Sequence, residues 1–506
     1  MSNIGKTSII VTIFNILGIG ISFLGNILIA KFFGTSIEMD VYLSASSFPL
    51  FLTSIITGAL SVTFIPIFSE SKNSKDIDIW DVVSTLLNLS FLLTLILTII
   101  ISIFAREIIN VISPGFNEVK TLLAISILRW QSPLIVLTVI NELVTSVYYS
   151  NNLFKTPLIN RLISPILTIV IIVLMTNFVS IYSVVYASIV GSIAQTLILI
   201  GGYLINKNFK YYFKLNLKNK KVRETGRLMI PLLLGMIFYR IMPVFDKIIG
   251  SKLAQGSISY LGYSYKIFSQ IPPLLSTGIS VSIFPVLSVY ISSGNLELVK
   301  DKISKSIKMI LFISLPITLI VYLNSSLIIK TLFERGVFSS KDTYFTSNAL
   351  SLYVLTLPVL AVGDIISKGY YAFKDTRTPA IVGVIEVIIY IISVYFLLPH
   401  FGYLSIPISF IIYIYVSMIN IYILRQKLGN SGGKTIIYAF FQFLIVAVFL
   451  SYFISLIIQS VDILFLKLVL IMLNIFLYFL INLLVFKNYE AIIFLNLFKK
   501  VIHFNK

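Results

Sequence analysis

The sequence predicts an all-α polytopic membrane protein with about fourteen transmembrane helices, arranged as two six-helix lobes in parallel repeats plus a C-terminal helix pair. Hydrophobic residues make up 58% of the 506-residue chain and charged residues only 12%, whereas soluble domains carry about 25% charged residues. Apolar runs long enough to cross a bilayer core of roughly 30 Å recur along the chain. Two phrases of the first half also recur in the second half.

The apolar runs define the expected membrane segments. The first run is too long for a cleavable signal peptide and lacks a small-residue cleavage site, so it is expected to remain in the protein. The expected segments, in order, are 9–33, 41–68, 80–104, 120–149, 157–177, 180–206, 227–250, 257–288, 303–324, 343–368, 379–398, 402–424, 435–458 and 463–486.

The repeated phrases define the repeat unit. SVTFIPIFSE at 61–70 returns as SVSIFPVLSV at 280–289, and YYSNNLFKTP at 148–157 returns as YYAFKDTRTP at 370–379. The first phrase ends the second segment and its copy ends the eighth, so the repeat unit is about six helices. An even number of helices gives both copies the same orientation, which is typical of transporters that move two lobes about a central cavity.

The repeat also sets the expected domain bounds. The N-lobe is expected at 1–206 and the C-lobe at 227–427, joined by a basic cytoplasmic linker at 207–226. Residues 428–506 hold the last two segments and a cytoplasmic tail.

The formal net charge of +19 is distributed unevenly. If the N-terminus is cytoplasmic, Lys and Arg concentrate in the connections on the cytoplasmic side, which fits the positive-inside rule and places both termini in the cytoplasm. The stretch KNFKYYFKLNLKNKKVRETGR at 207–227 contributes most. We therefore expect a multi-pass protein of the bacterial cytoplasmic (inner) membrane, a monomer that contacts anionic lipids at the cytoplasmic face and no nucleic acid.

The chain offers little for catalysis. It has no cysteine, and its two histidines, His400 and His503, are far apart in sequence. This excludes a disulfide framework, a thiolate metal site and a cysteine nucleophile. A membrane glycan polymerase would need large outer loops, but the longest expected outer connections are the short stretches 105–119 and 325–342. The sequence favours a transporter over an enzyme.

Ionisable residues inside the expected membrane segments are the candidate site, because each costs about 2.5–3.5 kcal/mol at the bilayer centre. Glu142 and Asp364 precede the paired tyrosines of the two phrases by the same six positions, so we expect them to face a cavity from opposite lobes. Lys266, Arg240 and Arg129 are the candidate cations for a diphosphate group. Arg129 and Arg240 could instead pair with carboxylates and serve packing alone.

Several longer phrases resemble the MurJ/MviN-type lipid II flippases, a branch of the multidrug/oligosaccharidyl-lipid/polysaccharide exporter superfamily. The phrases are ILIAKFFGTSIEMDVYLSASSFP, TGALSVTFIPIFSE, SKLAQGSISYLGYSYKIFSQIP, LFERGVF at 332–338 and YYAFKDTRTP. The resemblance covers about residues 9–427. It implies a fold of fourteen helices and alternating-access export of a polyprenyl-diphosphate-linked sugar, lipid II in peptidoglycan biosynthesis, to the outer leaflet.

The resemblance also implies roles for single residues. It assigns Lys266 as the basic residue of the eighth helix and Asp40 as the acid that opens the second helix. The family's cavity arginines correspond to Ile19, Gly25 and Thr53 here. This difference keeps open a flippase for a capsule, O-antigen or exopolysaccharide repeat unit. A cation-coupled multidrug exporter is a further alternative, against which Lys266 and Arg240 count.

The fuel for transport stays open at this point. Asp246 matches an acidic position that holds sodium in some family members, and Glu386 or Ser393 would supply the companion ligand on the eleventh helix. Hard oxygen ligands suit sodium, and a desolvated carboxylate suits protons. No other metal and no cofactor are expected. The membrane potential alone, worth about 2.3 kcal/mol per charge per 100 mV, could also drive an exported diphosphate.

Overall fold

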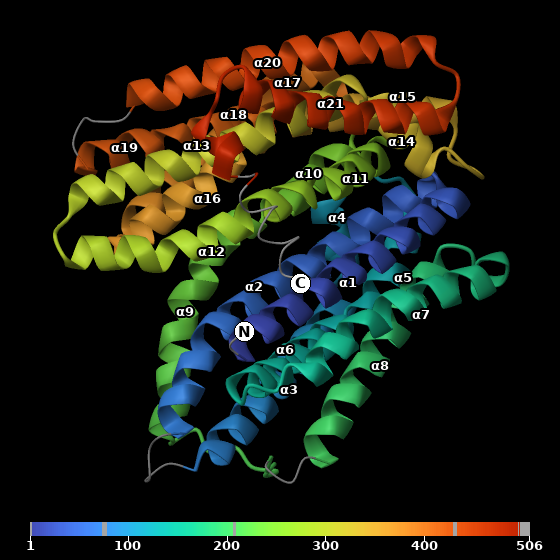
Figure 1. The fold of residues 1–506 in the computed structure, drawn as a ribbon. Coiled ribbons are helices and arrows are strands. Elements are labelled where there is room, and N and C mark those ends of the chain that lie inside the picture. Colours follow the sequence, from blue (N-terminus) through green and yellow to red (C-terminus); the bar gives the residue numbers. More distant parts are fainter. Residues whose placement is uncertain (1–2, 73–77, 206–208, 429–432, 494, 496–506) are drawn as a thin grey trace. The chain divides into compact units, whose positions relative to one another are not determined.

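A computed structural model describes residues 3–72, 78–205, 209–428, 433–493 and 495 (Figure 1). Every regular element in these ranges is a helix. The elements are α1 (Asn3–Phe33), α2 (Ile37–Lys72), α3 (Ile79–Ile103), α4 (Ala105–Ile112), α5 (Glu118–Gln131), α6 (Leu134–Ser150), α7 (Lys155–Val179), α8 (Tyr182–Ile205), α9 (Lys220–Arg240), α10 (Met242–Ser251), α11 (Ser257–Phe268), α12 (Ile271–Ser292), α13 (Leu296–Leu323), α14 (Ser325–Phe333), α15 (Ser340–Val354), α16 (Leu357–Ala372), α17 (Arg377–Phe401), the short 3₁₀ helix η1 (Gly402–Leu404), α18 (Ser405–Val416), α19 (Met418–Leu428), α20 (Gly433–Ser460) and α21 (Leu464–Leu484).

The predicted fold class is confirmed. Thirteen stretches of the described residues are long and apolar enough to cross a membrane. One of them, Arg377–Leu428, spans 52 residues and contains both segments that the sequence placed at 379–398 and 402–424. Counting these two separately gives the expected number of about fourteen.

Two equivalent segments of the repeat are interrupted helices. The segment predicted at 120–149 is α5 followed by α6, and the break lies at Ser132 and Pro133. The segment predicted at 343–368 is α15 followed by α16, which has Pro358 in its first turn. Proline has no N–H to donate to the preceding turn, which explains why a new helix starts at each point.

The chain separates into two compact units. The first comprises Met1–Ser259 and Leu332–Asp342, and the second comprises Tyr260–Thr331 and Thr343–Lys506. α9 and α10, which the repeat assigns to the C-lobe, pack against α2 of the first unit. The domain bounds drawn from the sequence follow repetition rather than packing, and they remain a prediction. The C-terminal tail lies mostly outside the described residues.

The first unit is organised around α2, which lies against α5, α6 and α9 (Figure 1). Leu60, Phe64 and Phe68 repeat every four positions and therefore share one face of α2, where they are buried. Phe209 and Val222, from the basic linker and the start of α9, pack into the same core. The described part of the linker is thus held by apolar burial as well as by its ends.

The first unit also includes residues 332–342, which come much later in the chain. The Val337 N–H donates to the Lys31 carbonyl at the end of α1, at 3.0 Å. The Thr35 hydroxyl donates to the Asp342 carboxylate. These contacts attach the connection between α14 and α15 to the turn between α1 and α2.

The second unit is organised around α13, which packs against α12, α16 and α20. Its buried residues include Ile303, Ile307 and Ile310 on one face of the helix. Phe443 of α20 and Tyr478 of α21 join the same core, with ring centroids each 5.4 Å from Phe312. The C-terminal helix pair is therefore packed into the second unit.

Candidate functional site

Glu142 and Ser61 are joined by a hydrogen bond in the first unit. The Ser61 hydroxyl of α2 donates to the Glu142 carboxylate of α6 at 2.6 Å. Ser61 is the first residue of the repeated phrase SVTFIPIFSE, and Glu142 precedes the repeated phrase YYSNNLFKTP. Glu142 is half-buried. The two phrases that revealed the repeat are thus linked in space.

The second unit repeats this contact. The Ser280 hydroxyl of α12 donates to the Asp364 carboxylate of α16. Ser280 opens the second copy of the first phrase, so the two serine–carboxylate pairs occupy equivalent positions. Lys368, one helical turn after Asp364, places its Nζ 3.8 Å from the other carboxylate oxygen. Whether Glu142 and Asp364 face a common cavity stays a prediction.

The paired tyrosines show the same equivalence. The Tyr148 hydroxyl donates to the Leu199 carbonyl of α8, at 3.2 Å. The Tyr370 hydroxyl donates to the Asn420 carbonyl of α19, at 2.8 Å. Each tyrosine fixes the fourth segment of its repeat to the sixth. The repeat therefore preserves a buried polar framework as well as the order of helices.

Lys266 is an exposed cation on a membrane segment. It lies in the last turn of α11 and is exposed within the structure. Among the described residues, no carboxylate lies within ion-pair distance of its ammonium group. Such a cation needs water or an anion beside it, because an unpaired charge is costly in hydrocarbon.

The two arginines differ in their surroundings. Arg129, in the last turn of α5, donates from Nε to the Ser102 carbonyl at 3.0 Å. Ser102 lies in the last turn of α3, where carbonyls lack helical partners, so Arg129 satisfies a helix end. Arg240 ends α9 and is exposed. Of these two cations, Arg240 is the better placed to meet an anion.

Asp40 is buried and has a structural partner. Its carboxylate accepts hydrogen bonds from the Gly256 N–H at 2.6 Å, from the Ser259 N–H at 2.8 Å and from the Ser259 hydroxyl at 2.6 Å. These groups lie at the start of α11, so Asp40 satisfies orphan donors of that helix and favours its N-terminus. The geometry gives Asp40 the role of a cap.

The acids predicted for ion coupling lie on different units. Asp246 lies on α10 of the first unit, half-buried and engaged in interactions there. Glu386 of α17 is 5% exposed, and the Asn420 side-chain amide donates to it at 3.5 Å. The Oδ1 atom of Asn420 is buried without a hydrogen-bond partner. Ser393 lies two helical turns beyond Glu386, about 10 Å along the axis, so the two are alternative ligands.

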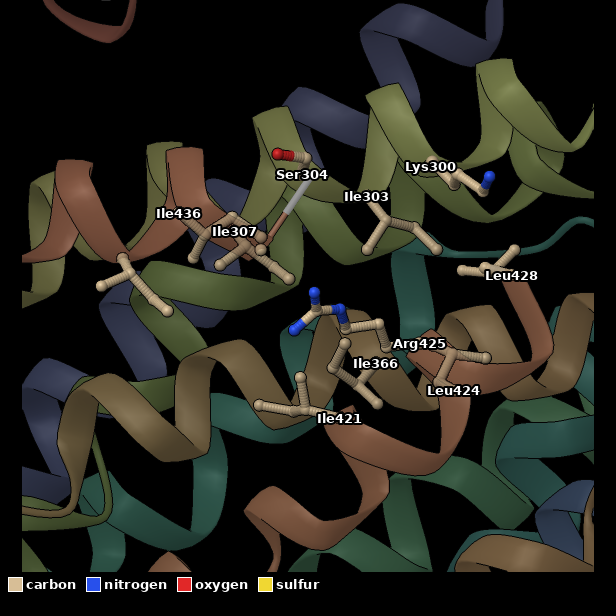
Figure 2. A pocket seen from close by; sticks show the side chains of 12 residues that line it. Lys300, Ile303, Ser304, Ile307, Ile366, Ile421, Leu424, Arg425, Leu428 and Ile436 are labelled. Atoms are coloured by element: carbon tan, nitrogen blue, oxygen red, sulfur yellow. The ribbon is translucent and has the colours of Figure 1, made fainter. Parts of the chain in front are cut away.

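Two apolar cavities of the second unit lie away from the predicted residues. A pocket of about 220 Å³ lies between α13, α16, α19 and α20, and Arg425 extends into it from α19 (Figure 2). A second apolar cavity of about 620 Å³ shares Ile307 and Ile421 with it. No residue predicted from the sequence lines either cavity. Within the described residues, no group of three or more His, Cys, Asp or Glu is placed to hold a metal ion.

Several residues of these contacts were not among the sequence candidates, among them Ser61, Ser280, Lys368 and Asn420. Ser61 and Ser280 open the repeated phrases, so their recurrence was a usable signal. Lys368 follows Asp364 by four positions, which places them on one helix face. For Asn420 the sequence carries no comparable signal, because its pairing with Glu386 depends on how α17 and α19 pack.

Comparison with known proteins identifies the family. The family description "Lipid II flippase MurJ" matches residues 29–478. The chain belongs to the MurJ lipid II flippase family. The family resemblance seen in the sequence phrases is therefore confirmed.

Curated members of the family share about a quarter of their residues with this chain. The "Probable lipid II flippase MurJ" of Buchnera aphidicola subsp. Baizongia pistaciae is 27% identical over 435 residues, covering 85% of this chain and 84% of the relative. The "Lipid II flippase MurJ" of Thermosipho africanus is 27% identical over 361 residues, covering 71% and 73%.

Solved structures agree with the family assignment. The structure titled "Lipid II flippase MurJ, inward closed conformation" is similar with a TM-score of 0.80 and 27% identity, covering 95% of this chain and 99% of that one. An inward-facing multidrug resistance MATE family transporter is similar with a TM-score of 0.69 and 15% identity, covering 80% and 94%. The MATE likeness shows the fold alone.

Proposed function

We propose that this protein exports lipid II, the undecaprenyl-diphosphate-linked peptidoglycan precursor, across the bacterial cytoplasmic membrane by alternating access. Membership of the MurJ family supports a flippase that works as a transporter and not as an enzyme. The relatives named above are described as lipid II flippases. The polyprenyl-diphosphate-linked sugar is the substrate class that this family membership supports.

The observation that carries the proposal is Lys266. An exposed lysine on a membrane-crossing segment lowers the barrier for a diphosphate, which would otherwise have to shed its hydration in hydrocarbon. Lysine acts on phosphate as a point charge that also releases it, whereas arginine holds it in a fork. Arg240 is a second exposed cation, on α9.

The test is rescue of a bacterium depleted of its own lipid II flippase. The native sequence should restore growth. The Lys266→Ala variant should reduce lipid II export about 10- to 150-fold, because a hydrogen bond to a charged group is worth about 1.5–3 kcal/mol. Export is measured by accessibility of lipid II at the outer face, with membrane expression confirmed for each variant.

Two control variants sharpen this test. Lys266→Arg keeps the cation and should retain most of the activity. Lys341→Ala removes an exposed lysine at the start of α15 and should leave export unchanged. Lysis with the native sequence would contradict the lipid II substrate, whereas full rescue by Lys266→Ala would contradict only the role of Lys266.

A second substrate has a specific observation in its favour. The family resemblance implies that Ile19, Gly25 and Thr53 stand where family members carry cavity arginines. Ile19 is 41% exposed on α1, and the Thr53 hydroxyl donates to its own helix at the Pro49 carbonyl. These residues offer no cation, so a capsule or O-antigen repeat unit carried on the same lipid would be the substrate if lipid II rescue fails.

For coupling, we propose a sodium ion held by Glu386 with Asn420 on the second unit. Glu386 is a buried carboxylate, and the buried Oδ1 of Asn420 has no hydrogen-bond partner, so a cation would satisfy both oxygens. Protons and the membrane potential alone are the competing fuels. Asp246 and Ser393 remain the other predicted ligands.

The coupling proposal is tested in proteoliposomes at fixed membrane potential. Transport by the native protein should rise with sodium, and Glu386→Gln should abolish that rise. Ile388→Ala, which shortens an exposed apolar side chain of the same helix, is the matched control and should keep it. If the transport rate of the native protein does not change with sodium concentration, the driving force is the membrane potential or a proton gradient.

The remaining expectations concern the setting of the protein. We propose that both termini are cytoplasmic, that the protein acts as a monomer and that its basic linker meets anionic lipids. The family and the many apolar helices support a multi-pass protein of the inner membrane. The distribution of Lys and Arg supports the orientation.

A further inference from the structure

The segment 209–219, between α8 and α9, is irregular, with a bend at Phe213 and a turn near its end, and it is bound along the first turns of α3; we call it the strap. The Tyr212 N–H donates to the Ser84 hydroxyl at 2.9 Å, and the Asn88 amide donates to the Lys214 carbonyl at 2.9 Å. The strap is therefore bound to α3 through its main chain.

Asp81, in the first turn of α3, binds three groups of the strap. Its carboxylate accepts from the Asn216 amide at 2.8 Å and the Asn219 amide at 3.2 Å, and it pairs with the Lys214 ammonium at 2.6 Å. This hydrogen bond raises the pKa of Lys214. The Lys214 ammonium group is thus paired within the protein. Asp81 fixes the position of the strap on α3.

Alternate residues of the strap expose apolar side chains. Phe213 is 93% exposed, Leu215 45% and Leu217 51%. Main-chain groups of Tyr212, Lys214 and Asn216 bond to α3, while the side chains of residues 213, 215 and 217 are exposed. Three exposed apolar side chains within five residues form a candidate interaction surface.

The surface of α3 shows how deep the strap lies. From Asp81 to Leu87 the residues of α3 are buried, partly under the strap. From Phe91 onward α3 exposes large apolar side chains, as a lipid-facing helix does: Phe91, Leu92, Leu93, Leu95, Ile96, Ile99 and Ile100. Asn88, which binds the strap, lies between the buried part and the exposed apolar part of α3. The strap therefore lies at the level where the hydrocarbon begins.

The strap also carries free positive charge at this level. Lys210 and Lys218 are exposed, as are Lys220 and Arg223 in the first turn of α9. A lysine or arginine near an anionic leaflet contributes about 1 kcal/mol of attraction. Apolar side chains beside exposed lysines are the composition of segments that lie in a membrane interface.

We propose that the strap is an interfacial anchor: Phe213, Leu215 and Leu217 insert at the boundary between headgroups and acyl chains of an anionic leaflet, and Lys210 and Lys218 bind lipid phosphates. The partner is the surface of a bilayer rich in anionic phospholipid. The anchor fixes the linker between α8 and α9 to the membrane plane. This inference rests on the proposed contact of the basic linker with anionic lipids, and it is independent of the substrate and of the coupling ion.

The chain contains no cysteine, so a single label reports one site. Phe213→Cys carries an environment-sensitive fluorophore, and the full-length protein is placed in nanodiscs of phosphatidylcholine with or without phosphatidylglycerol. We expect blue-shifted emission and quenching by spin-labelled lipids that places the label about 5–10 Å below the phosphates. Ser293→Cys, in the exposed turn after α12, is the control that aqueous iodide should quench.

Two results would overturn the proposal. If iodide quenches the label at position 213 as strongly as the label at position 293, the strap lies in water. The second result concerns the change in label insertion when phosphatidylglycerol is added. If this change is the same with and without the Lys210→Gln/Lys218→Gln substitutions, these lysines do not bind lipid phosphates. The expected result is that the double variant loses the response to phosphatidylglycerol while the label stays inserted.

Discussion

The two repeats keep the same serine–carboxylate pair but surround it differently. In the first unit the Glu142 carboxylate is bonded to Ser61, and the residue one turn later is the buried Ser146. In the second unit Asp364 is bonded to Ser280, and the equivalent residue one turn later is Lys368. One carboxylate is thus supported by a hydroxyl, and the other by a hydroxyl and a cation.

This difference has an energetic meaning. A carboxylate in a membrane segment needs compensation for the hydration it has lost. At Asp364 the ammonium group of Lys368 supplies part of it, although both side chains are about one-third exposed, so water also screens the pair. At Glu142 the serine carries a larger share. The comparison teaches that a duplicated unit can keep a hydrogen bond while the contribution of that bond to stability changes.

The largest expected effect comes from removing the serines. Ser61→Ala should lower the free energy of unfolding by about 1.5–3 kcal/mol, the usual worth of a hydrogen bond to a charged group. Ser280→Ala should cost less, about 1 kcal/mol, because Lys368 still supports Asp364. Thermal or denaturant unfolding of the purified protein in one detergent measures both.

Ser282→Ala serves as the control for these variants. Ser282 is exposed and donates to the Ile279 carbonyl of its own helix, so its loss should change stability by about 0.5 kcal/mol or less. Equal losses for Ser61→Ala and Ser280→Ala would mean that Lys368 contributes nothing, and the contrast between the repeats would disappear.

A smaller effect concerns the turn after the paired tyrosines, where Asp375 corresponds to Leu153 of the first unit. Lys427 pairs with Asp375, and Thr378 donates to it from its N–H at 3.0 Å and its hydroxyl at 2.7 Å. The bond from Lys427, followed by those from Thr378, holds the pKa of Asp375 well below its usual range. The first unit has no acid at this position.

The sign of the pH dependence follows from this lowered pKa. The stabilisation is complete above the unfolded pKa of about 4 and is lost as the pH falls through the lower pKa of the folded state. Asp375→Leu, which copies the first unit, should cost about 1 kcal/mol or less at pH 7, and the difference from the parent should shrink toward acid. A difference that grows toward acid in unfolding measured from pH 7 to pH 3 would contradict the role of this carboxylate.

Much of the fold was predictable from local signals. Apolar length alone locates the membrane helices, and the equivalence of Glu142 and Asp364 follows from their fixed distance to the repeated tyrosines. What the sequence could not supply was the partner of each ionisable group. From the sequence, Asp40 is expected to face a cavity. In the structure it caps α11, more than two hundred positions away. Only the packing of α2 against the start of α11 decides this.

For the strap, too, the sequence does not show what each side chain contacts. Its composition alone, rich in lysine, predicts contact with anionic lipid. Its alternation of Phe213, Leu215 and Leu217 is readable in the sequence, but an alternating stretch in a loop could face protein, water or lipid. The hydrogen bonds between α3 and the strap hold its main chain, and only the structure shows that these three side chains are exposed.

The attachment of residues 332–342 to the first unit has a consequence for how the protein is made. Thr35 and Asp342, which are hydrogen-bonded, are 307 positions apart. At about 5–20 residues per second of synthesis, roughly 15–60 s separate their emergence from the ribosome. During that interval α2 to α14 enter the membrane while the turn between α1 and α2 still lacks its contact with Val337. The first unit therefore completes its contacts only after residues 332–342 have been synthesised.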